Sequence, residues 1–167
     1  MTERILVRDL MTVGVSVCQL DTPAVDIARL MVEKDSECVV VLDSEGHAQG
    51  VVSQDDLVKA YAYKDWKTMT AEDVMSEGVP QVPPDLPLTV AAQMMRDQKV
   101  RAVFMMHNAA GIIYSAAMLT YKHLLRHMGA RDDSELSDLG NKATRKAPLD
   151  AFIERRDAAR RGARKSE

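Results

Sequence analysis

The sequence predicts a mixed α/β (α+β) fold in which one β-α-β-β-α unit occurs twice, followed by a basic C-terminal tail that is helical or flexible. Two observations carry this prediction. The chain resembles itself at a fixed spacing, and strand-like and helix-like patterns of apolar residues alternate within each copy. The length of 167 residues fits one domain or two very small ones.

The internal repeat consists of matching segments 64 residues apart. Asp9-Leu10-Met11 matches Asp73-Val74-Met75, Asp21-Thr22-Pro23 matches Asp85-Leu86-Pro87, Met31 matches Met95, and Cys38-Val39-Val40-Val41 matches Ala102-Val103-Phe104-Met105. The spacing then falls to 61, so that Gly111-Ile112-Ile113 matches Gly50-Val51-Val52. A length change confined to a turn is typical of a structural repeat.

The first copy predicts five elements in order. They are a short strand around Val15 and Val17, a helix that begins near Pro23 with Asp21 or Thr22 as its N-cap, a strand over Cys38–Leu42, a strand from Gly50, and a helix over Asp55–Tyr61. Residues 38–42 are apolar without alternation, which is typical of a strand covered on both faces. Each copy is too small to bury a comfortable core alone, so we expect the copies, at residues 5–64 and 65–128, to pack together.

The remaining residues, 129–167, form a charged extension. Residues 142–167 contain nine basic and four acidic side chains. Leu149, Phe152 and Ile153 give one weak apolar edge to a helix that begins near Pro148. A solvated helix is favoured over a surface for nucleic acid or an acidic partner, because Phe152 is the tail's only aromatic residue.

Composition and segment lengths exclude several classes of protein. With 46% apolar and 28% charged residues and a formal net charge of −3, neither wholesale disorder nor a uniformly basic nucleic-acid binder is expected. The longest apolar runs are far shorter than the roughly 18 residues of a membrane span. No secretory leader follows Met1, and Cys18 and Cys38 lie among valines without metal-site spacing. We therefore expect a cytoplasmic protein that is not membrane-bound.

Ser53 and Asp56 are the strongest candidates for a binding site. A hydroxyl at the end of a strand, followed three residues later by a carboxylate in the first turn of a helix, lies beside unpaired backbone N–H groups. Such a group suits a nucleotide, since the hydroxyl and amides bind phosphate and the carboxylate accepts from ribose hydroxyls. The alternative is purely structural, with Ser53 as N-cap and Asp56 as partner of the helix dipole.

The motif around these two residues resembles a known family. Gly50-Val51-Val52-Ser53-Gln54-Asp55-Asp56-Leu57 fits the closing pattern of cystathionine β-synthase (CBS) domains: Gly, two aliphatic residues, Ser or Thr, two variable residues, Asp, then Leu or Ile. Asp9-Leu10-Met11-Thr12 and Asp73-Val74-Met75-Ser76 fit the opening pattern. Residues 5 to 128 therefore resemble a tandem pair of CBS domains, a Bateman module.

This resemblance implies a ligand and a set of contacts. The ligand is an adenosine-containing nucleotide such as AMP, ADP or ATP, with Ser53 at phosphate and Asp56 at ribose. The base is held by backbone groups of an opening segment, Thr12, Val13, Gly14 and Val15, and of a strand segment, Glu37, Cys38, Val39 and Val40. Arg101 is the candidate phosphate counter-ion, against the alternative of a solvated surface arginine.

The second copy departs from this pattern. In the match at 61 residues, Tyr114 replaces Ser53 and Ala117 replaces Asp56, so the ribose acceptor is lost. We expect one competent site, with its counterpart empty, filled by Tyr114, or used for a less polar ligand. His123 and His127 have a spacing that can bind a metal, but with no third ligand apparent we expect partly exposed histidines and no metal.

The sequence is compatible with three functions. The first is a non-catalytic sensor that acts through an unidentified protein partner or through self-association, and for which the resemblance implies a homodimer. The second is a ligand-free dimeric scaffold for protein interactions. The third assigns nucleic acid or an acidic partner to the tail, and an enzyme is the least expected class because no nucleophile–base pair, metal cluster or Gly-rich phosphate loop is present in the sequence.

Overall fold

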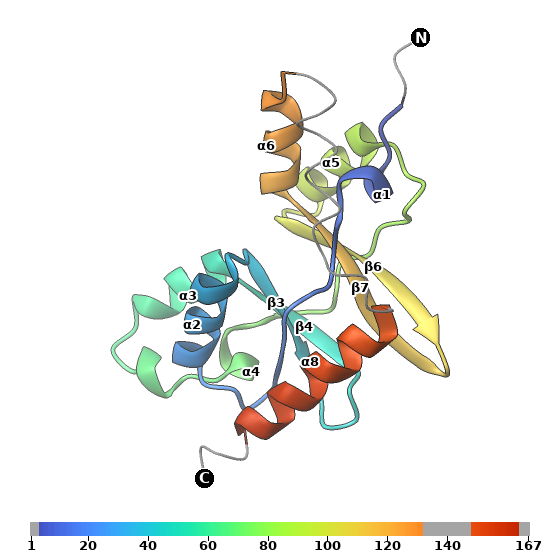
Figure 1. Ribbon diagram of the computed structural model, residues 1–167. Helices are drawn as coiled ribbons and strands as arrows, with labels where there is room; N and C mark the ends of the chain where they lie inside the picture. The colour runs from blue at the N-terminus through green and yellow to red at the C-terminus, as the bar shows by residue number, and fades with distance from the viewer. Residues whose placement is uncertain (1–3, 132–147, 164–167) are drawn as a thin grey trace. The chain divides into compact units, whose positions relative to one another are not determined.

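The computed structural model describes residues 4–131 and 148–163, which form two compact units (Figure 1). Unit 1 contains described residues 4–14, 80–131 and 148–149, and unit 2 contains 15–79 and 150–163. Each unit has one β-sheet with helices, so the mixed α+β fold class is confirmed. The part of the predicted tail at 132–147 and 164–167 lies outside the described residues.

Unit 2 is built on a four-stranded sheet in the order β2-β3-β4-β5. Its elements are β2 (Val17–Gln19), α2 (Ala24–Lys34), β3 (Cys38–Leu42), β4 (Ala48–Ser53), α3 (Gln54–Tyr61), a 3-10 turn (Trp66–Thr68), α4 (Ala71–Val74) and β5 (Ser76–Glu77). β2 and β3 run parallel, whereas β3–β4 and β4–β5 are antiparallel. The β-α-β-β-α order predicted for the first copy is confirmed.

Helix α2 and strand β3 follow from local sequence. All five residues of β3 are buried, which confirms a strand covered on both faces. Ile27 and Met31 of α2 pack with Val39 and Val41 in the core of unit 2. The predicted N-cap was wrong: Pro23 takes the N-cap position, where its fixed φ of −58° and missing N–H carry no cost, and the helix begins at Ala24.

Unit 1 is built on a three-stranded sheet in the order β1-β7-β6. Its elements are α1 (Val7–Leu10), β1 (Thr12–Val13), α5 (Leu88–Asp97), β6 (Ala102–Ala109), β7 (Ile112–Thr120) and α6 (Tyr121–Gly129). The first strand of the second copy is reduced to one bridge, Gln81 with Phe104, because the prolines around it supply no N–H groups to a ladder.

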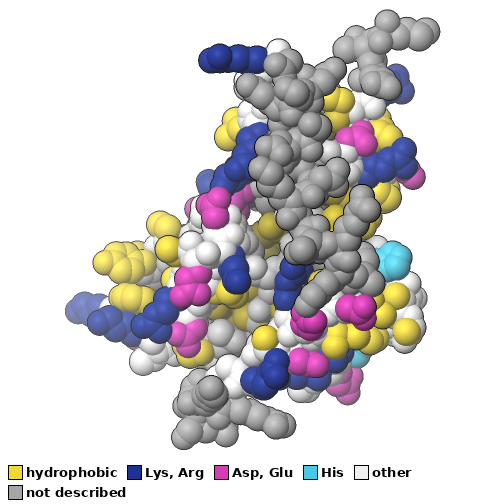
Figure 2. All heavy atoms as spheres, viewed as in Figure 1, with side chains coloured by type: hydrophobic (Ala, Val, Ile, Leu, Met, Phe, Trp, Pro, Cys, Tyr) yellow, Lys and Arg dark blue, Asp and Glu magenta, His cyan; other side chains and the backbone are white. Residues whose placement is uncertain are grey.

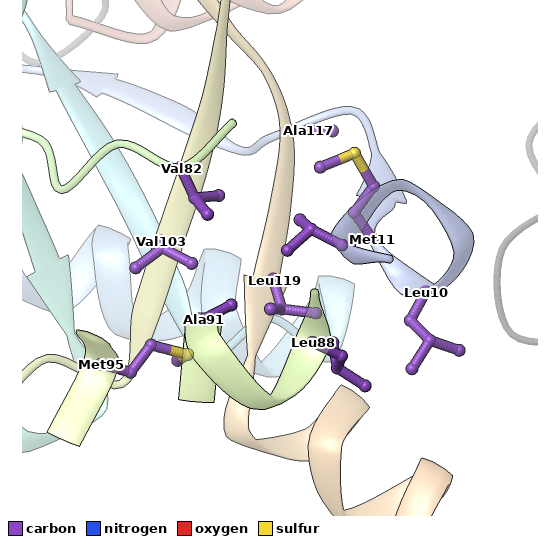
Figure 3. Packing of buried hydrophobic residues seen from close by; sticks show 10 residues of the cluster. Leu10, Met11, Val82, Leu88, Ala91, Met95, Val103, Ala117 and Leu119 are labelled. Atoms are coloured by element: carbon purple, nitrogen blue, oxygen red, sulfur yellow. The ribbon is translucent and has the colours of Figure 1, made fainter. Parts of the chain in front are cut away.

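The core of unit 1 combines residues from the N-terminal segment with residues from the second repeat. Leu10 and Met11 from the N-terminal segment pack with Met95 and Leu119 (Figure 3). The side chain of Met95 is fully buried, and that of Leu10 is 2% exposed. Packing of this kind fixes the N-terminal segment onto the sheet of unit 1.

The compact units therefore cross the sequence repeats. The opening segment of the first repeat belongs to unit 1, where β1 pairs with β7. The opening segment of the second repeat belongs to unit 2, where β5 pairs with β4. Each unit thus joins the opening segment of one repeat to the closing hairpin and helix of the other.

The predicted match between Gly111-Ile112-Ile113 and Gly50-Val51-Val52, in the closing hairpins of the two repeats, was wrong. Ser53 pairs with Cys38 at the end of β4, and the residue in the same position of the second hairpin is Thr120, which pairs with Ala102. The spacing between the copies therefore grows from 64 to 67 instead of falling to 61. The longer β6–β7 hairpin, with a bulge between Met105 and Met106, accounts for the difference.

The C-terminal helix α8 (Pro148–Ala163) confirms the helical reading of the tail for its described part. Phe152, the centre of its predicted apolar edge, is 3% exposed. Arg160 Nη2 donates to the Ser44 carbonyl at 2.7 Å, in the turn between β3 and β4. Arg156 Cδ lies 3.1 Å from where a Cβ on Gly46 would stand, so the helix lies directly on this turn.

Candidate nucleotide site at the junction of β4 and α3

Ser53 ends β4 and is the N-cap of α3, so one residue joins the sheet to the helix. Its Oγ accepts from the Asp56 backbone N–H at 3.2 Å. In return, Asp56 Oδ2 accepts from the Ser53 backbone N–H at 2.8 Å and from Ser53 Oγ–H at 2.6 Å. These reciprocal bonds are a capping box, so the structural role proposed for both residues is present.

The second oxygen of Asp56 has remaining capacity to accept. Asp56 Oδ1 lies 3.4 Å from Ser76 Oγ on β5, longer than the 2.5–3.0 Å range of a good O–H···O bond. Both Ser53 and Asp56 are half-buried, so solvent still reaches the group. A carboxylate fixed through one oxygen and open at the other is suited to accept from a ligand hydroxyl.

The strand segment predicted to hold the base lies beside this junction. Cys38 is the partner of Ser53 in the β3–β4 register, and the Gln54 backbone N–H donates to the Glu37 carbonyl at 3.2 Å. Val39 and Val40 continue β3 and are fully buried. Val15, also buried, precedes β2 in the same unit.

The two cysteines carry no chemistry at neutral pH. Burial raises the pKa of Cys18 and of Cys38 to about 12, and for Cys38 the nearby Glu37 carboxylate acts in the same direction. Neither side chain forms a disulfide bond in the part of the chain that the structure describes. Cys38 therefore contributes shape and backbone to this region and not a thiolate.

The other predicted contact residues belong to unit 1. Thr12 and Val13 pair with Met118 and Ala117 of β7, and the Gly14 N–H donates to Ala116. Arg101, just before β6, is exposed and makes no ion pair with any residue that the structure describes. Within a single unit, the structure thus brings together Val15, Glu37, Cys38, Val39, Val40, Ser53 and Asp56, and not Thr12, Val13, Gly14 or Arg101.

The corrected register changes the counterpart of this group in unit 1. Thr120 is the N-cap of α6 and His123 takes the position of Asp56. His123 Nδ1 accepts from the Thr120 backbone N–H at 2.9 Å, and Nε2 lies 2.6 Å from Thr12 Oγ1. The prediction that Tyr114 and Ala117 replace Ser53 and Asp56 was wrong, although the loss of the carboxylate stands.

Tyr114 instead lies within β7, with its ring buried at 2% exposure. Its hydroxyl lies 3.2 Å from His107 Nδ1 on β6. Burial raises the pKa of the Tyr114 hydroxyl, so this group stays neutral. The sequence match failed because Gly111-Ile112-Ile113 copies the residue types of Gly50-Val51-Val52, whereas the polar signal of the site recurs at Thr120.

His123 and His127 on α6 do not both have the partly exposed side chains that the sequence predicts. His123 is 6% exposed, so the expectation of a partly exposed residue was wrong for it. Both of its ring nitrogens have partners, which leaves no lone pair for a metal. Among the described residues, no group of three or more His, Cys, Asp or Glu side chains could hold a metal ion.

Part of the basic tail is used within unit 2. Arg156 is half-buried on the β3–β4 turn, and Arg160 donates to Ser44. These two arginines are therefore not displayed as a free basic face. In the described portion of the chain, no helix has the length and apolar character of a membrane span.

Comparison with known proteins identifies the family. The family model described as CBS domain matches residues 7–63 and 71–129. No protein with a curated description matches the chain.

Three solved structures illustrate the similarity in fold. The CBS domain pair of protein MJ0100, in complex with 5′-methylthioadenosine and S-adenosyl-L-methionine, has a TM-score of 0.66 at 18% identity over 77% of this chain and 98% of that chain. The CBS-domain protein ATU1752 from Agrobacterium tumefaciens has a TM-score of 0.66 at 18% identity, over 77% and 96% of the two chains. CBSX2 in complex with AMP has a TM-score of 0.56 at 25% identity, over 74% and 95%.

Proposed function

Because this chain belongs to the CBS-domain family, we propose that it is a non-catalytic regulatory module that binds an adenosine-containing nucleotide at the junction of β4 and α3. The observation that carries the proposal is the Asp56 carboxylate, which is held by Ser53 through Oδ2 and keeps capacity to accept at Oδ1. The family's closing motif is intact in this unit alone, since His123 stands at the equivalent position of unit 1.

Each part of the ligand has a proposed partner in the chain. Asp56 Oδ1 accepts from the ribose hydroxyls, which adds charge-assisted hydrogen bonds. Ser53 and the positive end of α3 bind phosphate, and Arg101 is the counter-ion. The base contacts backbone groups of Thr12, Val13, Gly14 and Val15 and of Glu37, Cys38, Val39 and Val40.

Adenosine is the shared chemistry of the ligands named for similar structures. CBSX2 is described in complex with AMP, and the MJ0100 domain pair with 5′-methylthioadenosine and S-adenosyl-L-methionine. This supports an adenosine ligand here, for which AMP, ADP and ATP are the first candidates. Cys18 and Cys38 are buried and form no disulfide with each other, which fits a reducing compartment, and we place the module in the cytoplasm.

The output passes through self-association or a protein target. With the register corrected, Val58 and Tyr61 on α3 correspond to Leu125 and Met128 on α6, and all four side chains are between 65% and 79% exposed. Figure 2 shows hydrophobic side chains gathered at the surface in the region of α2 and α3. Apolar side chains at the same two positions of both repeats support a homodimer that buries these helix faces.

Thermal unfolding with a ligand panel tests the proposal. Purified protein is heated with AMP, ADP, ATP, S-adenosylmethionine, NAD or GTP, and a ligand that binds only the folded state raises the midpoint by an amount that grows as RT ln(1 + [L]/Kd). Asp56→Asn keeps an oxygen for the cap and removes the charge, so we expect it to lose the shift.

Asp73→Asn is the matched control for this substitution. Asp73 caps α4 with the same geometry, since its Oδ2 accepts from the Thr70 N–H at 2.8 Å and from Thr70 Oγ1–H at 3.0 Å. This variant is expected to keep the ligand shift. Equal shifts in both variants would contradict the proposed role of Asp56.

The capping box itself favours one alternative, because it explains Ser53 and Asp56 without a ligand. In that case the chain is a dimeric scaffold for protein interactions. A folded dimer with no midpoint change for any compound in the panel would favour this function.

A further inference from the structure

The last helices of the two repeats keep the same apolar positions and reverse the charge beside them. Val58 of α3 and Leu125 of α6 are equivalent positions, and both side chains are exposed. Three residues earlier, α3 has Asp55 where α6 has Lys122. Helix residues three positions apart lie on the same side of the helix, so this charge lies beside the exposed apolar side chains.

The other charges of these helices follow the same division. Helix α6 contains Lys122 and Arg126 and no acidic residue, and acidic residues are absent from the whole stretch 98–131. Arg126 is exposed and makes no ion pair with any residue that the structure describes. Helix α3 has two acidic residues and one basic residue, and α4, which packs against α3, has two acidic residues and no basic one.

The division extends to each compact unit as a whole. The described residues of unit 1 contain eight Lys or Arg and three Asp or Glu side chains, a net formal charge of +5. Those of unit 2 contain nine and sixteen, a net formal charge of −7. Because faces of opposite charge attract and faces of like charge repel, these values decide which faces of two copies can meet.

We propose that, in the homodimer, α3 of each copy packs against α6 of the other, so that a second copy of this chain is the partner of both helix faces. This inference rests on the proposed function, of which the homodimer is a part. A twofold axis produces the α3–α6 contact twice, and each contact joins an acidic unit to a basic one. The alternative is like-with-like pairing, in which α3 packs against α3 and α6 against α6.

Charge, and not apolar burial, separates the two arrangements. The exposed apolar side chains of α3 can bury against those of either helix, so the hydrophobic contribution is similar in both. Like-with-like pairing places two α6 helices without any acidic residue against each other, and this repulsion acts against the wrong arrangement. Asp55 pairs with Lys59 on its own helix at 2.7 Å, but its side chain is 44% exposed, so a cation of the second copy can also reach it.

The salt dependence of the dimer is the first test, and it needs no variant. Salt screens charges at an exposed interface, so it weakens an attractive pairing and strengthens a repulsive one. We expect the dissociation constant of the dimer, measured by sedimentation, to rise several-fold between about 50 mM and about 500 mM sodium chloride. A dissociation constant that stays constant or falls over this range overturns the α3–α6 pairing.

Reversing one charge on α6 is the second test. In the α3–α6 pairing, Arg126→Glu places an acidic residue against the acidic unit in both contacts, so we expect the dissociation constant to rise about tenfold. Like-with-like pairing predicts a fall, since the repulsion between the two α6 helices is reduced. Arg4→Glu is the control, because it makes the same charge change at an exposed position of unit 1 that is not on α6, and it should change the constant by less than about twofold.

Single cysteines identify directly which helices face each other. Val58→Cys and Leu125→Cys are treated with a short bismaleimide, each alone and as a mixture after subunit exchange, with a mass tag on one variant. Cys18 and Cys38 do not compete, because both are buried and burial raises the pKa of each thiol to about 12. We expect a cross-linked product of both variants in the mixture and little product from either variant alone. A product from one variant alone that equals or exceeds that of the mixture overturns the pairing.

Light scattering and AMP binding on the same samples show which part of the account fails. A dimer without the mixed cross-link overturns the α3–α6 pairing and leaves the nucleotide site in place. A monomer removes the homodimer from the proposed function, and the pairing falls with it. The nucleotide site is judged separately, by the change in the unfolding midpoint with AMP.

Discussion

At the scale of single residues, the third position of a helix is used for opposite chemistry in the two units. Asp56 presents a carboxylate that is fixed by its cap and still able to accept, whereas His123 presents a ring with both nitrogens engaged. The backbone geometry is the same, because a capping residue accepts the N–H of the N-cap in both cases. Under the proposed function, this one side chain therefore determines whether the junction can accept from the hydroxyls of a ribose.

Gly50 is a second residue whose identity is dictated by its surroundings. A Cβ at this position would overlap the Ser76 carbonyl of β5 and lie 2.8 Å from Met75 Sδ. We expect Gly50→Ala to lower the free energy of unfolding by about 2–3 kcal/mol, because backbone and not a flexible side chain must move. Urea unfolding measures this loss.

Gly129→Ala is the control, since a Cβ there meets nothing within 4 Å at the end of α6. It should be neutral or slightly stabilising. Equal effects of the two substitutions would contradict the close approach of β5 to β4.

At the scale of helices and strands, the sequence predicts those elements whose position is determined by a local pattern of residues. The buried strand β3 follows from an unbroken apolar run, and α8 follows from its apolar edge around Phe152. The register of the β6–β7 hairpin cannot be predicted in this way. The length of the hairpin and the bulge at Met105 depend on strand pairing, which local residue types do not encode. The Thr120-x-x-His123 pattern before Leu124 was the available signal, and a search for the closing motif with His allowed at the Asp position would have found it.

Helix α8 provides a test at this scale. An isolated helix of 16 residues is marginal in water, so its order depends on docking through Phe152 and the Arg160–Ser44 bond. We expect Phe152→Ala to raise the amide exchange rates of α8 at least tenfold while β3 stays protected. Arg155→Ala, at an exposed position, should leave exchange unchanged, and persistent protection in Phe152→Ala would contradict the docking account.

At the scale of the whole molecule, the exchange of opening segments between repeats is the feature that sequence comparison misses. The repeat is visible as self-similarity at 64 residues, but self-similarity carries no information on which copy of a segment pairs with which sheet. The predicted contact set reflects this limit. Ser53 and Asp56 follow from a local motif, whereas Thr12, Val13 and Gly14 prove to belong to the sheet of the other unit.

Charged substitutions on α3 and α6 test the proposed self-association of the whole molecule. Val58→Glu with Leu125→Glu places charges at equivalent positions of α3 and α6, where 70% and 65% of each side chain is exposed. We expect light scattering to show a dimer for the wild type and a monomer for the double variant, with unfolding stability nearly unchanged in each unit. A dimer that survives both charges would exclude these helix faces as the contact.

Calorimetric titration with adenosine and 2′-deoxyadenosine measures whether Asp56 recognises the ribose of an adenosine ligand. Removing the 2′-hydroxyl deletes one hydrogen bond to a carboxylate, which is worth about tenfold in affinity. If Asp56 accepts from the 2′-hydroxyl, the wild type and Asp73→Asn prefer adenosine by about this factor, and Asp56→Asn binds both compounds equally weakly. A preference for adenosine that persists in Asp56→Asn would contradict this role of Asp56.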